Sequence, residues 1–260
     1  MGKKPDVIYP LTLACARDAE CLSLLVKSAR ALGDPRLAPW TALVDPDDSA
    51  FDDDLDLAII ERLPGFSPWS PRSAEVKLNA FLQVADHWQA GDSDYVLHVD
   101  SDCIFYSAEA LGLLDGKADI VGPLHNKPVQ VLGAPLAWCS GAFMGLRVDK
   151  LREVAHAVPV ARALEIMRRE GMGPEEMSHD DLVISVMFHA ACAHFHDAQP
   201  LVRTGDLEDV TLGREVAPSL LHYGTDARTF LGVPNCPKWQ FPEALATYKE
   251  GLCLKTSSRR

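Results

Sequence analysis

The chain has 260 residues, 47% hydrophobic and 24% charged, which is typical of a globular protein with a substantial core and excludes a disordered, fibrous or coiled-coil chain. Its 37 acidic and 25 basic residues give a formal net charge of -12. This charge argues against a protein that binds nucleic acid mainly by neutralising phosphates, although a local basic channel remains compatible with it.

The first half of the chain predicts alternating strands and helices. Short apolar runs mark the strands, and apolar positions on one face mark the helices. The expected elements, in chain order, are a strand at 6–13, a helix after Asp18, a strand at 40–44, a helix at 73–88, a strand at 95–99, a helix at 107–114 and a strand at 119–122. Between residues 45 and 56, seven aspartates predict a solvated loop. The alternation indicates parallel β-α-β units, whose ligands collect at the carboxyl ends of the strands.

The second half is less regular. A glycine-containing apolar stretch covers 138–146, helices are expected at 149–156 and 180–193, and a short strand is expected at 220–223. The sequence contains no internal repeat and no linker that would separate two domains. A single domain over residues 1–260 is therefore expected.

The longest uncharged stretches do not predict a membrane helix. Residues 128–146 and 182–196 are interrupted by glycine and proline or by histidine, and neither reads as about 20 continuous apolar residues. The amino-terminal apolar run ends at Arg17-Asp18 without a convincing cleavage site. The seven cysteines are scattered and lack a C-x-x-C pair, which favours reduced, mostly buried thiols. These features predict a cytoplasmic protein without integral membrane association.

Asp100-Ser101-Asp102 is the most informative tripeptide, because it directly follows the apolar strand YVLHV. In an extended backbone the side chains alternate, so both carboxylates would face one side while Ser101 points away. Two carboxylates facing one point suit Mg²⁺ or Mn²⁺, which keep coordination positions open for phosphate oxygens. A surface turn that happens to contain two aspartates is the alternative, and the preceding strand favours the metal site.

Five segments in this order resemble the metal-dependent nucleotide-sugar glycosyltransferases of the GT-A fold. They are AEVKLNAF, YVLHVDSDCIF, WCSGAFMGL, HDDLVIS and LLHYGT, within a resemblance that covers about residues 6–225. The resemblance implies one α/β, Rossmann-like GT-A domain with a mixed, mainly parallel central sheet flanked by helices. It further implies that about residues 1–125 bind the nucleotide sugar, that about 126–240 bind the acceptor and complete the metal site, and that 241–260 form a tail.

The resemblance also implies metal ligands. In the family, the second aspartate of D-x-D binds the metal and the first contacts the ribose or a metal-bound water, so these roles fall on Asp102 and Asp100, with Ser101 among the donor contacts. His222, in LLHYGT, matches a histidine that the family often supplies as a further ligand, and imidazole suits Mn²⁺ better than Mg²⁺. A core histidine at a strand end is the alternative for His222. The other histidines are expected to be structural, among them His98, His189, His194 and His196.

His179-Asp180-Asp181-Leu182 resembles the acidic pair that inverting GT-A enzymes place beside the acceptor. One carboxylate there takes the proton from the acceptor hydroxyl. The resemblance makes Asp181 the candidate general base and Asp180 its neighbour, and a second carboxylate nearby would raise the pKa of the base. The alternative is an ordinary helix start, with Asp180 as the N-cap residue.

Further donor contacts follow from the same resemblance. Gly141, in WCSGA, matches a small-residue turn beneath the donor sugar, where glycine permits close approach of the backbone. A buried strand with a bulge is the alternative for this turn, and a solvated lysine is the alternative for Lys77. The implied contacts to the nucleotide and its phosphates are Ala14, Arg17, Asp45, Lys77 and Arg228.

The resemblance thus predicts a glycosyltransferase that moves a sugar from a nucleoside-diphosphate sugar, with UDP as the expected nucleotide, to an acceptor hydroxyl. HDDLVIS favours an inverting reaction, whereas the KLNAF and D-x-D arrangement also occurs in retaining members. The acceptor stays open between a small molecule, a glycan, a protein and a hydroxymethylated base in DNA. An aspartate-nucleophile phosphohydrolase and a nucleotide-sugar binding module without turnover are the alternatives from other functional classes.

Overall fold

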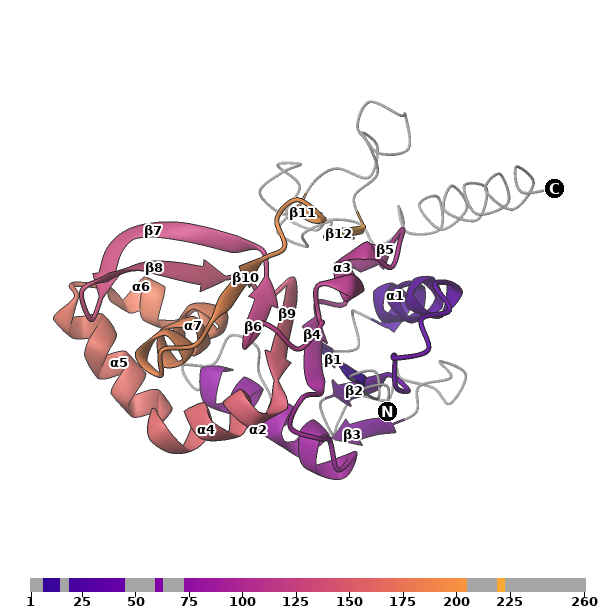
Figure 1. Cartoon of the computed structure of the whole chain (residues 1–260), viewed down its shortest axis with the longest axis horizontal. Helices are drawn as coiled ribbons and strands as arrows, with labels where there is room; N and C mark the ends of the chain where they lie inside the picture. The colour runs from indigo at the N-terminus through magenta and orange to yellow at the C-terminus, as the bar shows by residue number, and fades with distance from the viewer. Residues whose placement is uncertain (1–6, 15–18, 45–58, 63–72, 205–218, 223–260) are drawn as a thin grey trace.

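A seven-stranded mixed sheet lies at the centre of the protein (Figure 1). The computed structural model describes residues 7–14, 19–44, 59–62, 73–204 and 219–222, and all structural statements below concern these residues. The strand order is β10-β6-β9-β4-β1-β2-β3. The strands are β1 (Ile8–Ala14), β2 (Thr41–Val44), β3 (Ile59–Arg62), β4 (Tyr95–Val99), β6 (Ile120–Gly122), β9 (Phe143–Arg147) and β10 (Phe195–Asp197).

Most neighbouring strands of this sheet run parallel. β4, β1, β2 and β3 pair in parallel, and β10 pairs in parallel with β6, whereas β9 is antiparallel to both β4 and β6. The expectation of a mixed, mainly parallel sheet is therefore confirmed. Within this sheet the carboxyl ends of β1 and β4 lie at the same edge, where the hydroxyl of buried Thr12 donates to the carbonyl of Val99 at 2.8 Å.

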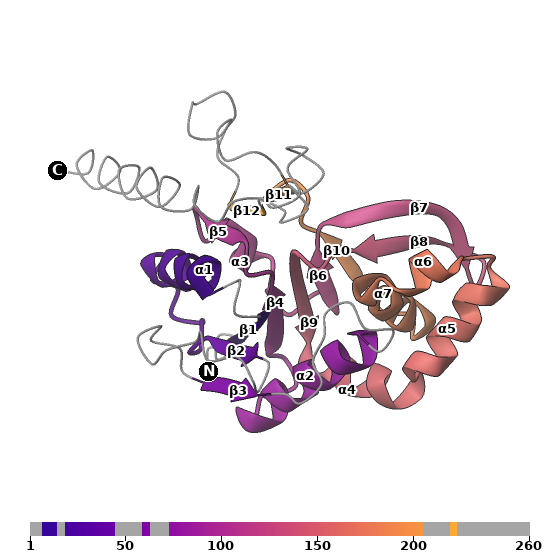
Figure 2. The same ribbon diagram turned by 180° about the vertical axis from the view of Figure 1, so that it is seen from behind.

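Helices cover both faces of the sheet. The helices are α1 (Ala19–Ala31), α2 (Ser73–His87), α3 (Glu109–Gly112), α4 (Val148–Ala157), α5 (Val160–Arg169), α6 (Pro174–Met177) and α7 (Asp180–Ala190). One face packs against α2, α4 and α7, and the opposite face packs against α1 and α3 (Figures 1 and 2). None of the described helices is long and apolar enough to cross a membrane.

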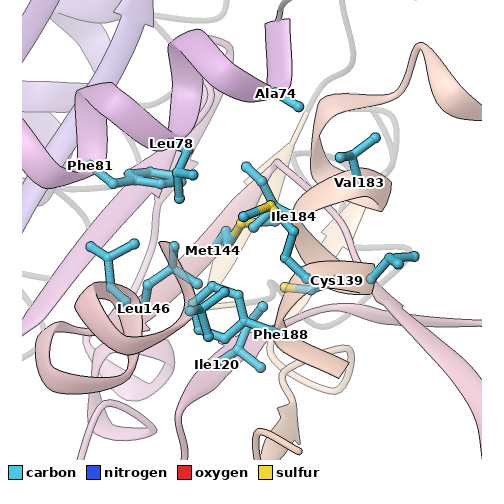
Figure 3. Close-up of a cluster of buried hydrophobic side chains, with 14 of the residues drawn as sticks. Ala74, Leu78, Phe81, Ile120, Cys139, Met144, Leu146, Val183, Ile184 and Phe188 are labelled. Atoms are coloured by element: carbon cyan, nitrogen blue, oxygen red, sulfur yellow. The ribbon is translucent and has the colours of Figure 1, made fainter. Parts of the chain in front are cut away.

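The packing of α2 and α7 on the sheet fixes the positions of the polar residues that these helices carry. Figure 3 shows Leu78 and Phe81 of α2 near Met144 of β9, with Ile184 and Phe188 of α7 completing the cluster. Phe81, Ile184 and Phe188 have no accessible surface. Truncating such side chains to alanine costs about 2–5 kcal/mol. The backbones that carry Lys77 and Asp181 are therefore held by the core.

Two smaller sheets complete the described structure. The first is a three-stranded sheet with β12 (Leu220–His222) in the middle, between β5 (Cys103–Phe105) and β11 (Val202–Thr204). β7 (Leu124–Val131) and β8 (Ala134–Cys139) form a hairpin that lies over α7 in Figure 1. Its turn residues, Leu132 and Gly133, have φ angles of 52° and 83°, and two left-handed residues match the right-handed twist of the flanking strands.

The predicted bounds agree best with the observed ones in the helices and strands that pack into the core. The strand at 95–99 has the predicted bounds, and the helix at 73–88 ends one residue early. The helix expected at 107–114 is reduced to four residues, α3, and the one expected at 180–193 ends at Ala190. The aspartate-rich segment 45–56 lies outside the described residues. The elements that were not predicted are β3, β5, β7, β8, β10, β11, α5 and α6, and β9 was expected only as part of an apolar stretch.

Candidate metal centre and the adjoining acidic site

Asp100, Ser101 and Asp102 form a tight turn between β4 and β5. The amide of Cys103 donates to the carbonyl of Asp100 at 3.2 Å, and the amide of Asp100 donates to the carbonyl of Ala142 at 3.4 Å. The extended backbone expected for this tripeptide is therefore wrong. Asp102 is 5% exposed and Ser101 9%, whereas the side chain of Asp100 is 37% exposed, so the turn is buried on one side and accessible at Asp100.

His222 reaches this turn through β-sheet pairing. β12 runs antiparallel to β5, with His222 opposite Cys103, the residue after Asp102. The Nε2 atom of His222 lies 3.2 Å from Oδ1 of Asp102 and 3.6 Å from Oδ2 of Asp100. One ligand atom from each of the three side chains lies within 4.8 Å of the others. The two aspartates and the histidine that the sequence predicted as metal ligands are thus brought together.

The donor set fits a divalent cation. The pKa of Asp100 is raised to about 6, chiefly by burial and also by the charges of Asp102 and Asp180, whereas His222 and Lys77 oppose this shift. A cation between the two carboxylates would relieve their repulsion. Two carboxylates and one imidazole suit Mn²⁺, and also Mg²⁺ with more water in its coordination shell.

His98 is a site neighbour that the sequence analysis missed. It is 2% exposed, its Nδ1 atom lies 2.8 Å from the carbonyl of Gly141, and its Nε2 atom lies 3.7 Å from Oδ1 of Asp100. Burial and the charge of Lys77 hold the pKa of His98 well below its ordinary value, so the ring is neutral. The sequence signal that could have placed His98 beside the site is its position two residues before Asp100, because alternate residues of a strand share a face.

An isolated lysine on a helix is usually solvated, and this was the alternative for Lys77. The structure shows instead that Lys77 is buried. Its side chain is 5% exposed, and Nζ lies 3.5 Å from Oδ2 of Asp180. Burial lowers the pKa of Lys77, but the charges of Asp180, Asp100 and Asp181 outweigh that effect and raise it overall. The ammonium group is therefore charged and lies between the metal centre and the acidic pair.

Asp181 is tied to the turn that contains Gly141. Its Oδ2 atom accepts the amide proton of Gly141 at 2.9 Å, and its Oδ1 atom accepts that of Leu182 at 2.9 Å. A Cβ atom built on Gly141 would lie 3.0 Å from Nζ of Lys77. A larger residue would therefore press on the ammonium group of Lys77, and glycine avoids this crowding. Burial raises the pKa of Asp181, and the charge of Lys77 opposes the shift.

The acidic pair forms the first turn of α7. The helix begins at Asp180, and His179 occupies the N-cap position without a side-chain hydrogen bond to the helix. The alternative in which Asp180 is the N-cap residue is thus wrong, although both acids still favour the positive end of the helix dipole.

Of the predicted nucleotide contacts, Ala14 is the last residue of β1 and is 1% exposed. The other predicted nucleotide contacts, Arg17, Asp45 and Arg228, lie outside the described residues.

The thiols nearest the site are reduced and buried. Cys103 and Cys139 are free, and burial raises the pKa of both, whereas free Cys192 is exposed. The expectation of reduced thiols holds for these three cysteines. Neither Cys103 nor Cys139 offers an activated nucleophile, because burial disfavours the thiolate at both positions.

The fold and the site together define an α/β protein with a candidate metal centre at the carboxyl edge of its sheet. No protein-family model and no curated protein sequence matches the chain. Solved structures do: the galactosyltransferase LgtC with donor and acceptor sugar analogues is 12% identical, with a TM-score of 0.55 over 93% of this chain and 95% of that one. An active-site mutant of LgtC gives 0.57 at 12% identity and the same coverage.

The bifunctional glycosyltransferase WbbM, without ligand, is similar as well. It is 11% identical, with a TM-score of 0.54 over 84% of this chain and 46% of that one. These likenesses show that the chain has the GT-A fold, as its five sequence segments implied.

Proposed function

We propose that the protein is a metal-dependent glycosyltransferase that moves a sugar from a nucleoside-diphosphate sugar to an acceptor hydroxyl. The observation that carries the proposal is the convergence of Asp100, Asp102 and His222 at the sheet edge, beside buried Lys77 and the partly buried acidic pair Asp180 and Asp181. The similar structures, one described with donor and acceptor sugar analogues, support the same activity. An aspartate-nucleophile phosphohydrolase has no comparable structural support.

In this proposal Asp102 and His222 hold the cation directly, and Asp100 contacts it or the ribose. The cation, when bound, would neutralise the charge of the departing nucleoside diphosphate. His98 donates its Nδ1–H to the Gly141 carbonyl, and its neutral ring adds no positive charge beside the cation. The remaining proposed contacts to the donor are Ala14, Arg17, Asp45, Ser101 and Arg228.

Lys77 and Gly141 form the proposed floor beneath the donor sugar. Nζ of Lys77 lies 3.5 Å from Oδ2 of Asp180, and the charges of Asp100 and Asp181 also act on it, so it offers N–H donors without adding a net positive charge to the site. Gly141 lets the backbone approach both Lys77 and Asp181 closely. A fixed polar floor orients the sugar without reorganisation during the reaction.

We further propose that Asp181 takes the proton from the acceptor hydroxyl, which corresponds to an inverting reaction. Burial raises the pKa of Asp181, which makes it a stronger base than an exposed carboxylate. A different observation favours the retaining alternative. Both carboxylate oxygens of Asp181 already accept backbone amide protons, which suits a support for the Gly141 turn. The anomeric configuration of the product, read by NMR, decides between the two courses.

The finer assignments belong to the same proposal. They are a UDP-sugar as the donor, Mn²⁺ as the preferred metal, a cytoplasmic location, and a division into a nucleotide half at about 1–125 and an acceptor half at about 126–240. A screen of nucleoside-diphosphate sugars with Mn²⁺, in which released nucleoside diphosphate is measured with and without chelator, tests the proposal. Metal-independent release, or release from no donor, would contradict it.

A further inference from the structure

Three rings lie together beside the acidic pair and have no part in the site described so far. His125 of β7 and Trp138 of β8 are directly opposite each other in the hairpin, with ring centroids 5.4 Å apart. The ring of His179, which precedes α7, lies 5.8 Å from that of Trp138. We call His125, Trp138 and His179 the ring cluster.

The ring cluster adjoins the acidic site through two short segments. His179 is followed directly by Asp180 and Asp181, and Trp138 precedes Gly141 by three residues. The hydrogen bond from the Gly141 amide to Asp181 joins these two segments. The ring cluster therefore keeps a fixed position relative to the carboxylate that we propose as the base.

The cluster is a surface feature. His125 and His179 are exposed and Trp138 is partly buried. The ring of His179 also does nothing for the helix that it precedes, because it makes no capping hydrogen bond. Helix stability therefore does not account for an imidazole at this position, where serine, threonine, aspartate or asparagine would stabilise the helix.

The chemistry of the cluster suits a neutral sugar ring. A pyranose has faces of C–H groups, which pack on aromatic rings, and a rim of hydroxyls, which hydrogen-bond to imidazole nitrogens. The nearby carboxylates of Asp180 and Asp181 disfavour an anionic ligand.

From this arrangement we propose that His125, Trp138 and His179 bind the acceptor, and that the acceptor presents a neutral sugar ring. This inference rests on the proposed function and names the acceptor class that the sequence left open. Among the earlier candidates it selects a glycan or a glycoside over a modified DNA base, whose strand would bring phosphates to an acidic surface.

Saturation-transfer NMR on the full chain with Mg²⁺ and UDP tests the inference. The probes are methyl β-D-glucopyranoside, methyl β-D-galactopyranoside and the anionic methyl β-D-glucuronide. We expect transfer from the protein to the ring protons of at least one neutral probe. In Trp138→Leu and His179→Ala its dissociation constant should rise about five- to tenfold, the equivalent of one lost ring contact.

Trp88→Leu is the matched control, because Trp88 is also partly buried and also pairs with a histidine ring, that of His87 at 5.3 Å, on α2. This variant should bind the probe as the wild type does. If Trp138→Leu fails to fold, His179→Ala decides, because its side chain is exposed and caps no helix.

Unchanged probe binding in both ring variants would overturn the inference. Binding of none of the neutral probes, or preference for the glucuronide, would overturn it as well. Nucleotide binding, measured by calorimetry on the same samples, separates this result from a failure of the proposed function. A protein that binds UDP with Mg²⁺ but no sugar contradicts the acceptor site alone, whereas failure to bind UDP, GDP or ADP contradicts the proposed function.

Discussion

The Nε2 atom of His222 lies 3.2 Å from Oδ1 of Asp102, although 120 residues separate them in the chain. The antiparallel pairing of β12 with β5 brings them together, with His222 opposite the residue after Asp102. The candidate metal centre therefore depends on a sheet of three short strands, and its integrity is coupled to that of the segment that carries β12.

The first prediction concerns His222 as a metal ligand. His222→Ala should weaken Mn²⁺ binding by more than the about 10- to 100-fold that follows loss of an outer-shell partner, because a direct ligand is removed. Calorimetric titration with Mn²⁺ measures the effect. His196→Ala is the control, since His196 is exposed on β10 and takes no part in the site. Equal Mn²⁺ affinity in both variants would remove His222 from the ligand set.

The second prediction concerns the close approach at Gly141. In Gly141→Ala the new methyl group would meet Nζ of Lys77 at 3.0 Å and Oδ2 of Asp181 at 3.6 Å. Nζ of Lys77 must then move from its position beside Asp180, so we expect a loss of turnover of about tenfold or more, as misplacement at an active site commonly causes. Gly112→Ala on α3 is the control, because a Cβ atom there meets nothing within 4 Å. Wild-type turnover in Gly141→Ala would contradict the proposed floor.

The third prediction separates the two roles of Asp181. If Asp181 is the base, Asp181→Asn should reduce kcat strongly and leave donor binding nearly unchanged, because the loss affects the chemical step alone. The asparagine still offers one oxygen to the Gly141 amide, so the turn should persist. Single-turnover kinetics and donor titration measure the two quantities. A retained anomeric configuration together with nearly normal kcat would assign Asp181 to support of the turn.

The fourth prediction follows from the raised pKa of Asp100. Its folded-state pKa of about 6 exceeds its ordinary value of 3.8, so between these pH values the folded state binds more protons than the unfolded state. Stability of the metal-free protein contributed by this group therefore falls as the pH rises from about 4 to about 6. Mn²⁺ binds the ionised carboxylate, so its affinity should rise over the same range.

Thermal unfolding with chelator across this pH range tests the fourth prediction. Asp100→Asn is the reference, because its amide does not titrate there. The melting temperature of the wild type should fall relative to that of Asp100→Asn as the pH rises. Parallel pH profiles for the two proteins would show that Asp100 has an ordinary pKa.

The sequence determined the features that local patterns encode. The strand at 95–99 was predicted because five consecutive apolar or aromatic positions end at two aspartates, and the helix at 73–88 because its apolar residues share a face. The ordered set of five segments also indicated the GT-A fold and singled out Asp100, Asp102 and His222. The pattern could not show that the tripeptide turns instead of extending, because the turn, closed by the bond from the Cys103 amide to the Asp100 carbonyl, leads into β5, whose pairing partner β12 is distant in the chain.

Only the tertiary structure decided which side chains near the site are buried and which of them are charged. Burial of Lys77 among three acids depends on the packing of α2 against α7 and β4, which the sequence of α2 alone does not specify. The same holds for the neutral ring of His98 and for the ring cluster, whose members come from β7, β8 and the start of α7. Charge and burial are properties of neighbours distant in the chain, so they follow from packing and not from local pattern.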